Sequence, residues 1–367
     1  MHNNEEKEFI FWLNNVKGIG QTKAHALINM FGSAKAVYNL SSTKLSSISF
    51  LTAETVNDMQ KNRIDTTLEF IQKLHNLNIK VVTYIEKDYP FYLKEMRYPP
   101  LVLYYKGQLI DFEKEIPIGV IGARNCTSYG RECTFKISKE LGINGAVVVS
   151  GLAKGIDTYS HKAAVENGFK TVAVVGCGLD ICYPEENKAL MEEICKNGCV
   201  FSEYPPGTKP LKHHFPARNR IIAGICRGIL VVEARIKSGT FITVNFAADE
   251  GRDVFCLPGN ITSSLSEGTN QLIREGATLI TSGEEILIGY YSIDKKFKSV
   301  IKELPNLSKL STDETILYLE LKKYKEISLE NIKLEHKFDY NTLIYILMTL
   351  ELKGFIIKKP GNIYCVK

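Results

Sequence analysis

Six short runs of apolar, mostly β-branched residues, separated by segments long enough to form helices, constrain the fold of this chain more than any other feature. They begin at about Pro117 and read IGVIG, AVVVSG, TVAVVG, CVFSEY, GILVVEA and DVFCLPG. Nearly continuous apolar strands that alternate with helices form a parallel sheet that is covered on both faces. The sequence therefore predicts an α/β domain built on an extended Rossmann-like parallel sheet.

Glycine-containing segments follow several of these runs, and ligands of an open parallel sheet bind beyond the carboxyl ends of its strands. The first run is followed by Gly122 to Asn125 and then by the start of a helix, which places Arg124 beside free backbone amides. The second is followed by Ser150 to Asp157, where glycines let the backbone approach a ligand and Asp157 is expected to cap the next helix. With Lys237 to Thr240 after the fifth run, these segments predict several phosphate-binding loops along one edge of the sheet.

The third run ends in a partial dinucleotide-binding fingerprint. Gly176-Cys177-Gly178 begins like that motif, but Ile181 stands where the third glycine should be, so the pattern is weak support for a nicotinamide nucleotide. The adjacent His213 and His214 would point in different directions on a helix or a strand, which makes them a poor pair of metal ligands. We predict neither a cofactor nor a metal.

Beyond the fourth run, the segment from Lys209 to Arg220 reads KPLKHHFPARNR and holds four Lys or Arg residues, two His and one Phe without an acid. Cations that neutralise phosphates beside an aromatic face suit a single-stranded nucleic acid. A solvated basic loop before a helix is the alternative, since lone surface charges contribute little to stability. The phosphate-binding loops predicted nearby favour the nucleic acid.

Glu203 and Glu233 end their runs near the same edge of the sheet. Either could act as a general base. We expect them instead to pair with Arg218 or Arg220, because a half-buried guanidinium needs a planar acceptor.

Residues 1–83 read as a helical domain. Two periodic apolar segments flank the turn from Lys17 to Gly20, which is typical of a helix-hairpin-helix or SAM-like domain. Such a turn can direct backbone amides at a phosphate, or it can serve packing alone. The apolar positions of the two segments are Phe9, Trp12, Leu13, Val16, Ala24, Leu27, Ile28 and Phe31.

The sheet domain is predicted to span residues 84–290, followed by a polar linker over 291–310 and a last domain over 311–367. Three helical stretches and a two-strand pattern predict a winged helix for the last domain. Its third helix should begin at the N-cap Asp339 and bury Leu343, Leu347 and Leu350. Because the opposite face of this helix carries few cations, we favour packing or contact with partners over DNA reading.

Composition sets the remaining limits. The formal net charge of +5 is a mild excess, so any patch that binds nucleic acid must be local. Nine cysteines without a CxxC pair indicate reduced thiols rather than a disulfide framework or a zinc site. The N-terminus carries acids where a secretory signal would carry basic residues, and no apolar run is long enough to cross a membrane. We expect a cytoplasmic protein with no membrane contact.

Taken together and in order, the motifs along residues 84–290 closely resemble the DNA-processing protein A (DprA/Smf) family. They are GARNCTSYGRE, SGLAKGIDTYSH, VAVVGCGLDICYPEEN, SEYPPGTKP, HHFPARNRIIAGICRGILVVEA, KSGTFIT and EGTNQLIREGA. The resemblance implies a protein that binds and protects incoming single-stranded DNA during natural transformation and that loads the RecA recombinase. It also implies a homodimer. We expect a non-catalytic mediator rather than an enzyme.

The resemblance implies particular site residues as well. Arg124 corresponds to a phosphate-binding arginine, and Lys212 with Phe215 to a basic and stacking pair. Two departures, Ala123 in place of a hydroxyl residue and Ala217 in place of a basic one, could lower the affinity. The predicted binding residues are Gly122, Arg124, Ser150, Gly151, Lys154, Lys212, Phe215, Arg218, Asn219, Arg220, Ser238 and Gly239.

Two other functions stay open. Related sheets with similar glycine loops hold nucleotides, so the chain could be a nucleotide hydrolase or phosphoribohydrolase, although no convincing acid/base pair is evident. A winged-helix transcription factor would instead bind a specific duplex sequence tightly, which the weakly basic third helix argues against.

Overall fold

The computed structural model describes residues 2–61, 64–293, 310–321, 324, 327–335, 339–359 and 361–366. The chain divides into two compact units, Met1–Lys298 and Ser299–Lys367. The predicted linker of residues 291–310 begins within a helix of the first unit, and residues 294–309 lie outside the described part of the chain.

A nine-stranded sheet forms the centre of the first unit, in the order β1-β2-β6-β5-β4-β3-β7-β8-β9. All strand pairs from β6 through β9 are parallel, which confirms the prediction of a large, mostly parallel sheet. The two strands at the β1 edge are antiparallel. The strands are β1 (Lys80–Thr83), β2 (Val102–Gly107), β3 (Ile116–Ile121), β4 (Ala146–Ser150), β5 (Thr171–Val175), β6 (Cys199–Ser202), β7 (Gly228–Val231), β8 (Asp253–Cys256) and β9 (Thr278–Leu279).

Strands β3 to β8 are the six predicted runs, whereas β1, β2 and β9 lie outside them. The two-residue β9 is too short for a periodic signal, and β1 and β2 precede the region in which strands and helices alternate. Strand β1 pairs with β2 although it lies before the predicted boundary at residue 84, so the sheet begins earlier than the sequence pattern indicated.

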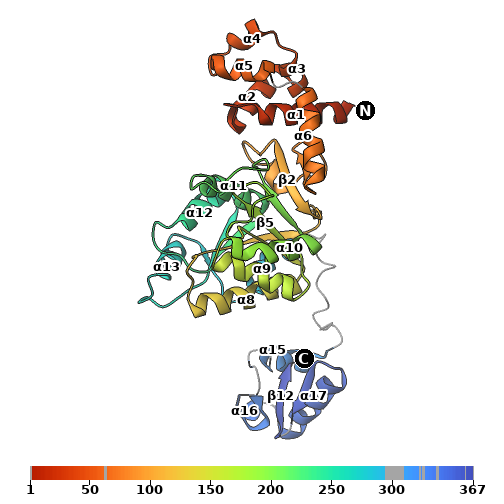
Figure 1. Ribbon diagram of the computed structural model, residues 1–367. Helices are drawn as coiled ribbons and strands as arrows, with labels where there is room; N and C mark the ends of the chain where they lie inside the picture. Colours follow the sequence, from red (N-terminus) through yellow and green to blue (C-terminus); the bar gives the residue numbers. More distant parts are fainter. Residues whose placement is uncertain are drawn as a thin grey trace. The chain divides into compact units, whose positions relative to one another are not determined.

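Helices cover both faces of the sheet because successive residues of each buried strand point to opposite sides. On one face, Val148 of β4 packs in the same core as Ile137 of α8 and Leu287 of α14. On the other, Val149 packs with Ile222 of α11. Figure 1 shows α8, α9 and α10 on one side and α11 and α12 on the other. The helices are α7 (Phe91–Lys94), α8 (Ser128–Ile143), α9 (Ile156–Glu166), the 3-10 turn η1 (Glu185–Asn187), α10 (Lys188–Asn197), α11 (His214–Ile225), α12 (Gly239–Asp249), α13 (Glu267–Arg274) and α14 (Gly283–Ile293).

The strand order changes direction at β3. Strands β4, β5 and β6 follow on one side of β3, whereas β7 and β8 follow on the other. The loops that leave β3 and β7 therefore diverge to opposite faces and open a crevice at their carboxyl ends. This is the edge at which the sequence predicts phosphate-binding loops.

The N-terminal residues form helices, as predicted, and these pack against the sheet. Phe11 lies 6.1 Å from Tyr104 of β2 between ring centroids, and Gln21 accepts a hydrogen bond from the backbone of Leu101 at 2.9 Å. Both parts share one apolar core, so the helices belong to the same folded unit as the sheet. They are α1 (His2–Asn15), α2 (Gln21–Phe31), α3 (Ala34–Tyr38), α4 (Ser42–Ser46), α5 (Ala53–Lys61) and α6 (Ile64–Asn76).

The second unit has its own core. As predicted, Asp339 caps α17, accepting hydrogen bonds from the amides of Asn341 at 3.0 Å and Thr342 at 3.1 Å. The helix buries Leu343, Leu347 and Leu350, also as predicted. The elements are α15 (Thr312–Leu321), β10 (Ile327–Ser328), α16 (Leu329–Glu335), α17 (Tyr340–Leu352), β11 (Ile356–Lys359) and β12 (Ile363–Val366), with sheet order β10-β12-β11.

Candidate functional site

A cavity of about 710 Å³ opens at the carboxyl ends of β3 and β7, and we call it the sheet-edge cavity. It brings together segments that are far apart in the sequence: the β3–α8 and β4–α9 loops, the residues leading into α11, and the start of α12. Of the predicted binding residues, its lining contains Gly122, Arg124, Lys212, Phe215, Arg218, Asn219, Ser238 and Gly239.

Arg124 and Phe215 form the most distinctive pair in this cavity. The guanidinium carbon of Arg124 lies 5.5 Å from the centroid of the Phe215 ring, within range of a cation–π interaction. The ring also packs over Gly176, where an added Cβ would lie 3.3 Å from Phe215. Arg124 itself is exposed, as is Lys212. The cavity thus offers an aromatic ring with solvated cations beside it.

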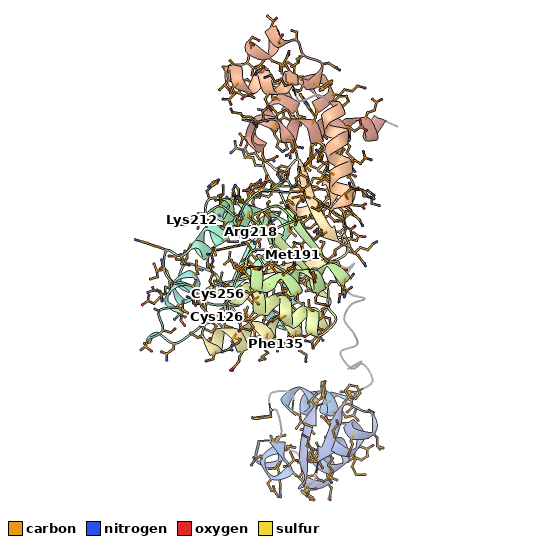
Figure 2. All side chains as sticks on the ribbon, in the orientation of Figure 1. Cys126, Phe135, Met191, Lys212, Arg218 and Cys256 are labelled. Atoms are coloured by element: carbon orange, nitrogen blue, oxygen red, sulfur yellow. The ribbon has the colours of Figure 1, made fainter. Side chains whose placement is uncertain are left out.

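Arg218 is buried beneath the cavity and fastens two loops. Its Nη1 donates to the carbonyl oxygen of Gly151, the residue after β4, at 2.6 Å, and to the carbonyl oxygen of Val174 in β5. Gly151 is required at its position, since an added Cβ would lie 2.5 Å from a guanidinium nitrogen. Arg218 belongs to α11, and Figure 2 labels it together with Lys212. It therefore ties β4, β5 and α11 into one rigid wall.

Asp157 does not cap α9, so that prediction was wrong. The N-cap is Gly155, whose φ of 76° suits glycine, and Asp157 lies inside the helix. Its Oδ2 instead accepts hydrogen bonds from the amides of Gly151 at 3.1 Å and Ala153 at 3.3 Å. Burial raises the pKa of Asp157, while the nearby Arg218 lowers it. The carboxyl group thus shapes the β4–α9 loop from within.

His161 completes this buried polar group. Its Nδ1 lies 2.8 Å from Oγ1 of Thr171, and that hydroxyl donates to the carbonyl of Val148 at 2.8 Å, so the imidazole nitrogen carries the shared proton. Burial, reinforced by the charge of Arg218, lowers the pKa of His161 to about 3. The side chain is neutral at physiological pH and serves the structure of the loop.

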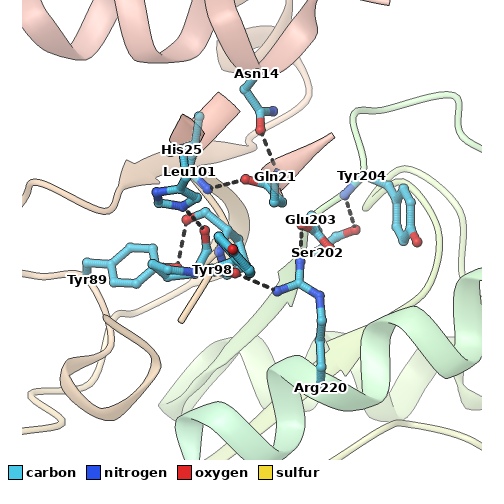
Figure 3. Close-up of polar contacts among 12 residues, drawn as sticks. Asn14, Gln21, His25, Tyr89, Tyr98, Leu101, Ser202, Glu203, Tyr204 and Arg220 are labelled. Carbon is cyan, nitrogen blue, oxygen red and sulfur yellow. Dashed lines mark hydrogen bonds and ion pairs between the residues drawn. The ribbon is translucent and has the colours of Figure 1, made fainter. Parts of the chain in front are cut away.

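Arg220 points away from the cavity and pairs with Glu203, which confirms one of the two expected glutamate–arginine pairs. Nη2 contacts Oε1 of Glu203, and Nη1 donates to the carbonyl of Tyr98 at 3.2 Å (Figure 3). The pairing expected for Glu233 was wrong. Its carboxylate accepts hydrogen bonds from the amide, at 2.9 Å, and the hydroxyl of Thr127. Because β7 pairs with β3, Glu233 ends beside the β3–α8 loop rather than beside α11. Its backbone carbonyl also accepts from the amide of Ala123 at 2.8 Å, so the amides predicted to be free beside Arg124 are partly occupied.

Three further predicted residues differ in the interactions that their side chains make. The hydroxyl of Ser150 donates to the carbonyl of Val120 at 2.7 Å and is fully buried. Lys154 is exposed and forms an ion pair with Glu186 at 2.6 Å. Ser238 precedes α12, and its hydroxyl, although enclosed, has no hydrogen-bond partner among the described residues. Of the three, Ser238 has the clearest unused capacity to bind a ligand.

The sequence reasoning missed Tyr183 as a site residue. It lines the sheet-edge cavity, and its ring centroid lies 5.5 Å from that of Phe215. It lies in the segment after β5 that begins with the partial fingerprint at Gly176, so its place in a loop beyond a strand end was the available signal. A single aromatic residue in a loop does not predict a binding site, and the sequence does not show that Phe215 of α11 lies next to it.

In the glycine turn between α1 and α2, a backbone amide is bound by the carboxylate of Asp58. The amide of Lys17 donates to Oδ2 of Asp58 at 2.8 Å, and the carbonyl of Gly18 accepts from Nζ of Lys23 at 3.2 Å. A carboxylate at this position satisfies the amide and repels an incoming anion. The observed contacts favour the packing role of this turn.

A second cavity, of about 770 Å³, lies beside β2 and α10. Its lining contains three lysines but also Asp180, Glu185 and Glu192. Since the acids offset the cations, this cavity is less suited to a polyanion than the sheet-edge cavity. Within the described residues, no cluster of His, Cys, Asp and Glu side chains could hold a metal ion, and no helix has the length and apolarity needed to span a bilayer.

Residues 80–290 match the family described as DNA recombination-mediator protein A, which is more than half of the 367 residues. The chain belongs to this family. The relatives carry the names DprA and Smf, and the resemblance to the DprA/Smf family is thereby confirmed. Membership places the chain among proteins of DNA processing and recombination mediation.

Individual DprA proteins are similar over much of the chain. The DNA processing protein DprA of Streptococcus pneumoniae is 52% identical over 203 residues, which cover 55% of this chain and 71% of that protein. The X-ray structure of DprA from S. pneumoniae matches with a TM-score of 0.66 at 39% identity, covering 76% of this chain and 95% of that one. A structure of Helicobacter pylori DprA, which concerns its single-stranded DNA binding mode, matches with a TM-score of 0.53 at 30% identity, covering 59% and 96%.

Proposed function

We propose that this DprA/Smf protein binds single-stranded DNA in the sheet-edge cavity and acts without catalysis as a recombination mediator. The observation that carries the proposal is the pairing of Arg124 with Phe215 inside a cavity that also holds Lys212 and the Ser238 hydroxyl, which has no hydrogen-bond partner in the described part of the chain. Cations and a hydroxyl at a helix start suit phosphates, and an aromatic ring suits a base.

The aromatic ring is the reason to favour a single strand over a duplex. Bases in a duplex are already stacked on each other, so Phe215 gains a partner only from an unpaired strand. A base stacked on an aromatic ring contributes about 1 to 3 kcal/mol and does so with little regard to sequence. The proposed ligand is therefore single-stranded DNA of any sequence.

We divide the predicted binding residues into two groups by their contacts. Arg124, Lys212, Phe215 and Ser238, with the backbone of Gly122 and Gly239 and the side chain of Asn219, are proposed to touch the DNA. Ser150, Gly151 and Arg218 are proposed to hold the cavity wall, because their polar groups are spent on buried hydrogen bonds. Lys154 and Arg220 are proposed to reach phosphates only after exchanging their present acidic partners.

Relatives support the same ligand. The H. pylori DprA structure concerns single-stranded DNA binding by that protein, and the likeness to it is at 30% identity. From the family resemblance we further propose that the protein protects incoming DNA during natural transformation, loads RecA and works as a homodimer. We also propose a helix-hairpin-helix or SAM-like nature for the N-terminal helices and a winged-helix nature for residues 311–367.

Fluorescence anisotropy with a labelled oligo-dT and a duplex of mixed sequence tests the proposal. The single strand should bind more tightly, and its affinity should fall steeply with salt because neutralised phosphates release counterions. Arg124→Ala and Lys212→Ala should each lower the salt slope by about 1. Phe215→Ala should weaken binding by about 1 to 3 kcal/mol with an unchanged slope, since stacking releases no ions. Equal affinity for the duplex would overturn the proposal.

A nucleotide-processing enzyme is the second candidate. The volume of the sheet-edge cavity, about 710 Å³, falls within the range of about 300 to 1,000 Å³ that is common for small-molecule sites. Incubation of the pure protein with nucleoside monophosphates or NAD distinguishes the two. Turnover above about 1 per second would favour the enzyme.

A further inference from the structure

Tyr183 gives the sheet-edge cavity a second aromatic surface. Its side chain is 47% exposed, whereas Phe215 is half-buried between Arg124, Gly176 and Tyr183 itself. The more open of the two rings therefore belongs to a residue that was not among the predicted binding residues. Exposed aromatic rings in a cavity lined by cations are the feature that single-stranded nucleic acids use for stacking.

The relative placement of the two rings limits how bases can meet them. Their centroids are 5.5 Å apart and their planes are inclined by 41°. A base inserted between two rings needs about 7 Å, twice the contact distance between carbon atoms. One base therefore cannot sit between Tyr183 and Phe215, and each ring has to receive its own.

The segment that carries Tyr183 is fixed to the cavity wall. The carbonyl of Pro184 accepts from the amide of Asn187 at 3.1 Å, and the side chain of Asn187 donates to the carbonyl of Leu152 at 2.9 Å. Asn187 is buried. Hydrogen bonds thus fix the loop that carries the Tyr183 ring, so little conformational freedom is lost when a base stacks on that ring.

We propose that Tyr183 stacks a second base, adjacent to the base on Phe215, so that the cavity holds two consecutive unpaired nucleotides bent between inclined rings. This inference rests on the proposed binding of single-stranded DNA and names a contact that the proposal does not include. The hydroxyl of Tyr183 is not needed for stacking, so a phenylalanine should serve as well.

The test compares Tyr183→Leu, Tyr183→Phe and the wild-type full-length chain by anisotropy with a short labelled oligo-dT across a salt series. Tyr183→Leu should raise the Kd at least about fivefold, which corresponds to about 1 kcal/mol, without changing the salt slope. Tyr183→Phe should bind like the wild type. Phe91→Leu, at a ring that is 40% exposed and lies outside the cavity lining, is the matched control and should have no effect.

A double variant separates stacking from mere support of Phe215. If both rings stack bases, the fold-changes of Tyr183→Leu and Phe215→Ala should multiply, and both losses should vanish on an abasic strand of equal length. A double variant no weaker than Phe215→Ala alone would overturn the inference, as would a wild-type affinity for Tyr183→Leu. If the wild type fails to prefer single-stranded DNA, the proposed function and this inference fail together.

Discussion

Two glycine-containing turns of this chain share a local sequence signature but differ in their surroundings. The turn from Lys17 to Gly20 and the turn from Gly122 to Asn125 each precede a helix and each carry one cation. In the first, the carboxylate of Asp58 takes the Lys17 amide. In the second, Arg124 remains exposed over a cavity.

The comparison shows that residues distant in sequence decide whether a glycine turn lies against an acid or beside an open cavity. Asp58 comes from α5 and closes the first turn. Around the second, Lys212, Phe215 and Ser238 come from segments about a hundred residues away and line a cavity beside Arg124, although the Glu233 carboxylate takes the amide of Thr127 at the start of α8. Five predictions test this contrast, in order of decreasing expected effect.

The largest effect is expected on stability, from the loss of Arg218, which is buried beneath the cavity beside the second turn. Arg218→Ala should lower the free energy of unfolding by about 3 to 5 kcal/mol, because it leaves the carboxyl group of Asp157 buried without its cation. Denaturant unfolding measures this. Lys212→Ala, at an exposed lysine near the same helix, should change stability by less than about 0.5 kcal/mol. Equal effects of the two would show that Arg218 does not support the cavity wall.

A pH-dependent loss of stability is expected from His161, which is buried near Arg218 and Asp157. Its folded-state pKa of about 3 lies below its ordinary value of 6.5, so the unfolded chain binds one more proton between these values. Stability should therefore fall as pH drops below 6.5, by about 1.4 kcal/mol per pH unit. Asp157, with a raised pKa, acts in the opposite direction. Unfolding of the wild type and His161→Gln at pH 6.5 and 4.5 isolates the histidine, and parallel pH profiles would contradict the assignment.

The cations of the two turns should differ in DNA binding. Arg124→Ala should weaken oligo-dT binding by about tenfold at low salt and lower the salt slope by about 1, as the loss of one phosphate contact predicts. Lys17→Ala should leave both quantities unchanged. Anisotropy titrations at several salt concentrations provide the comparison, and equal slopes for the two variants would remove the distinction between the turns.

Removal of residues 311–367 should have a smaller effect still. The exposed face of α17 carries Tyr340, Tyr345 and Glu351 rather than cations, and this segment belongs to a separate compact unit. The truncated protein should keep its oligo-dT affinity within about tenfold, or about 1.4 kcal/mol. The proposed loading of RecA should survive as well if the sheet-containing unit supplies that contact. A larger loss of affinity would assign DNA contacts to the second unit.

The smallest effect is expected at the first turn. Asp58→Ala removes the acceptor of the Lys17 amide and should cost about 1 kcal/mol of stability, the usual contribution of one hydrogen bond. The affinity for oligo-dT should not change. Tighter binding by this variant would reveal a latent anion site that Asp58 had masked.

Much of the sheet was predictable because its information is local. Strands β3 to β8 are continuous apolar runs with glycines at their ends, and helix α17 shows both its cap at Asp339 and its buried stripe. Strands β1 and β2 escaped prediction because antiparallel edge strands depend on partners elsewhere in the chain. For the same reason, the predicted domain boundary at residue 84 missed β1, which begins at Lys80.

The site was predictable in its members but not in their roles. The strand ends marked Arg124, Phe215 and Arg218, yet nothing local distinguished the exposed arginine from the buried one. That distinction arises because Gly151 lacks a side chain and admits the Arg218 guanidinium. Likewise, Glu233 was assigned to the wrong partner because the pairing of β7 with β3 decides which loop it meets.

The position of β3 between β4 and β7 has a consequence for synthesis on the ribosome. All six residues of β3 are buried in the finished protein, but one edge of the strand gains its hydrogen-bonding partner from Gly228–Val231, roughly a hundred residues later. At about 5 to 20 residues per second, a nascent chain exposes this apolar edge for about 5 to 20 seconds. An unpaired apolar strand edge is a template for aggregation. Translation speed and chaperone capture over this interval should therefore decide how much of the protein reaches its native state.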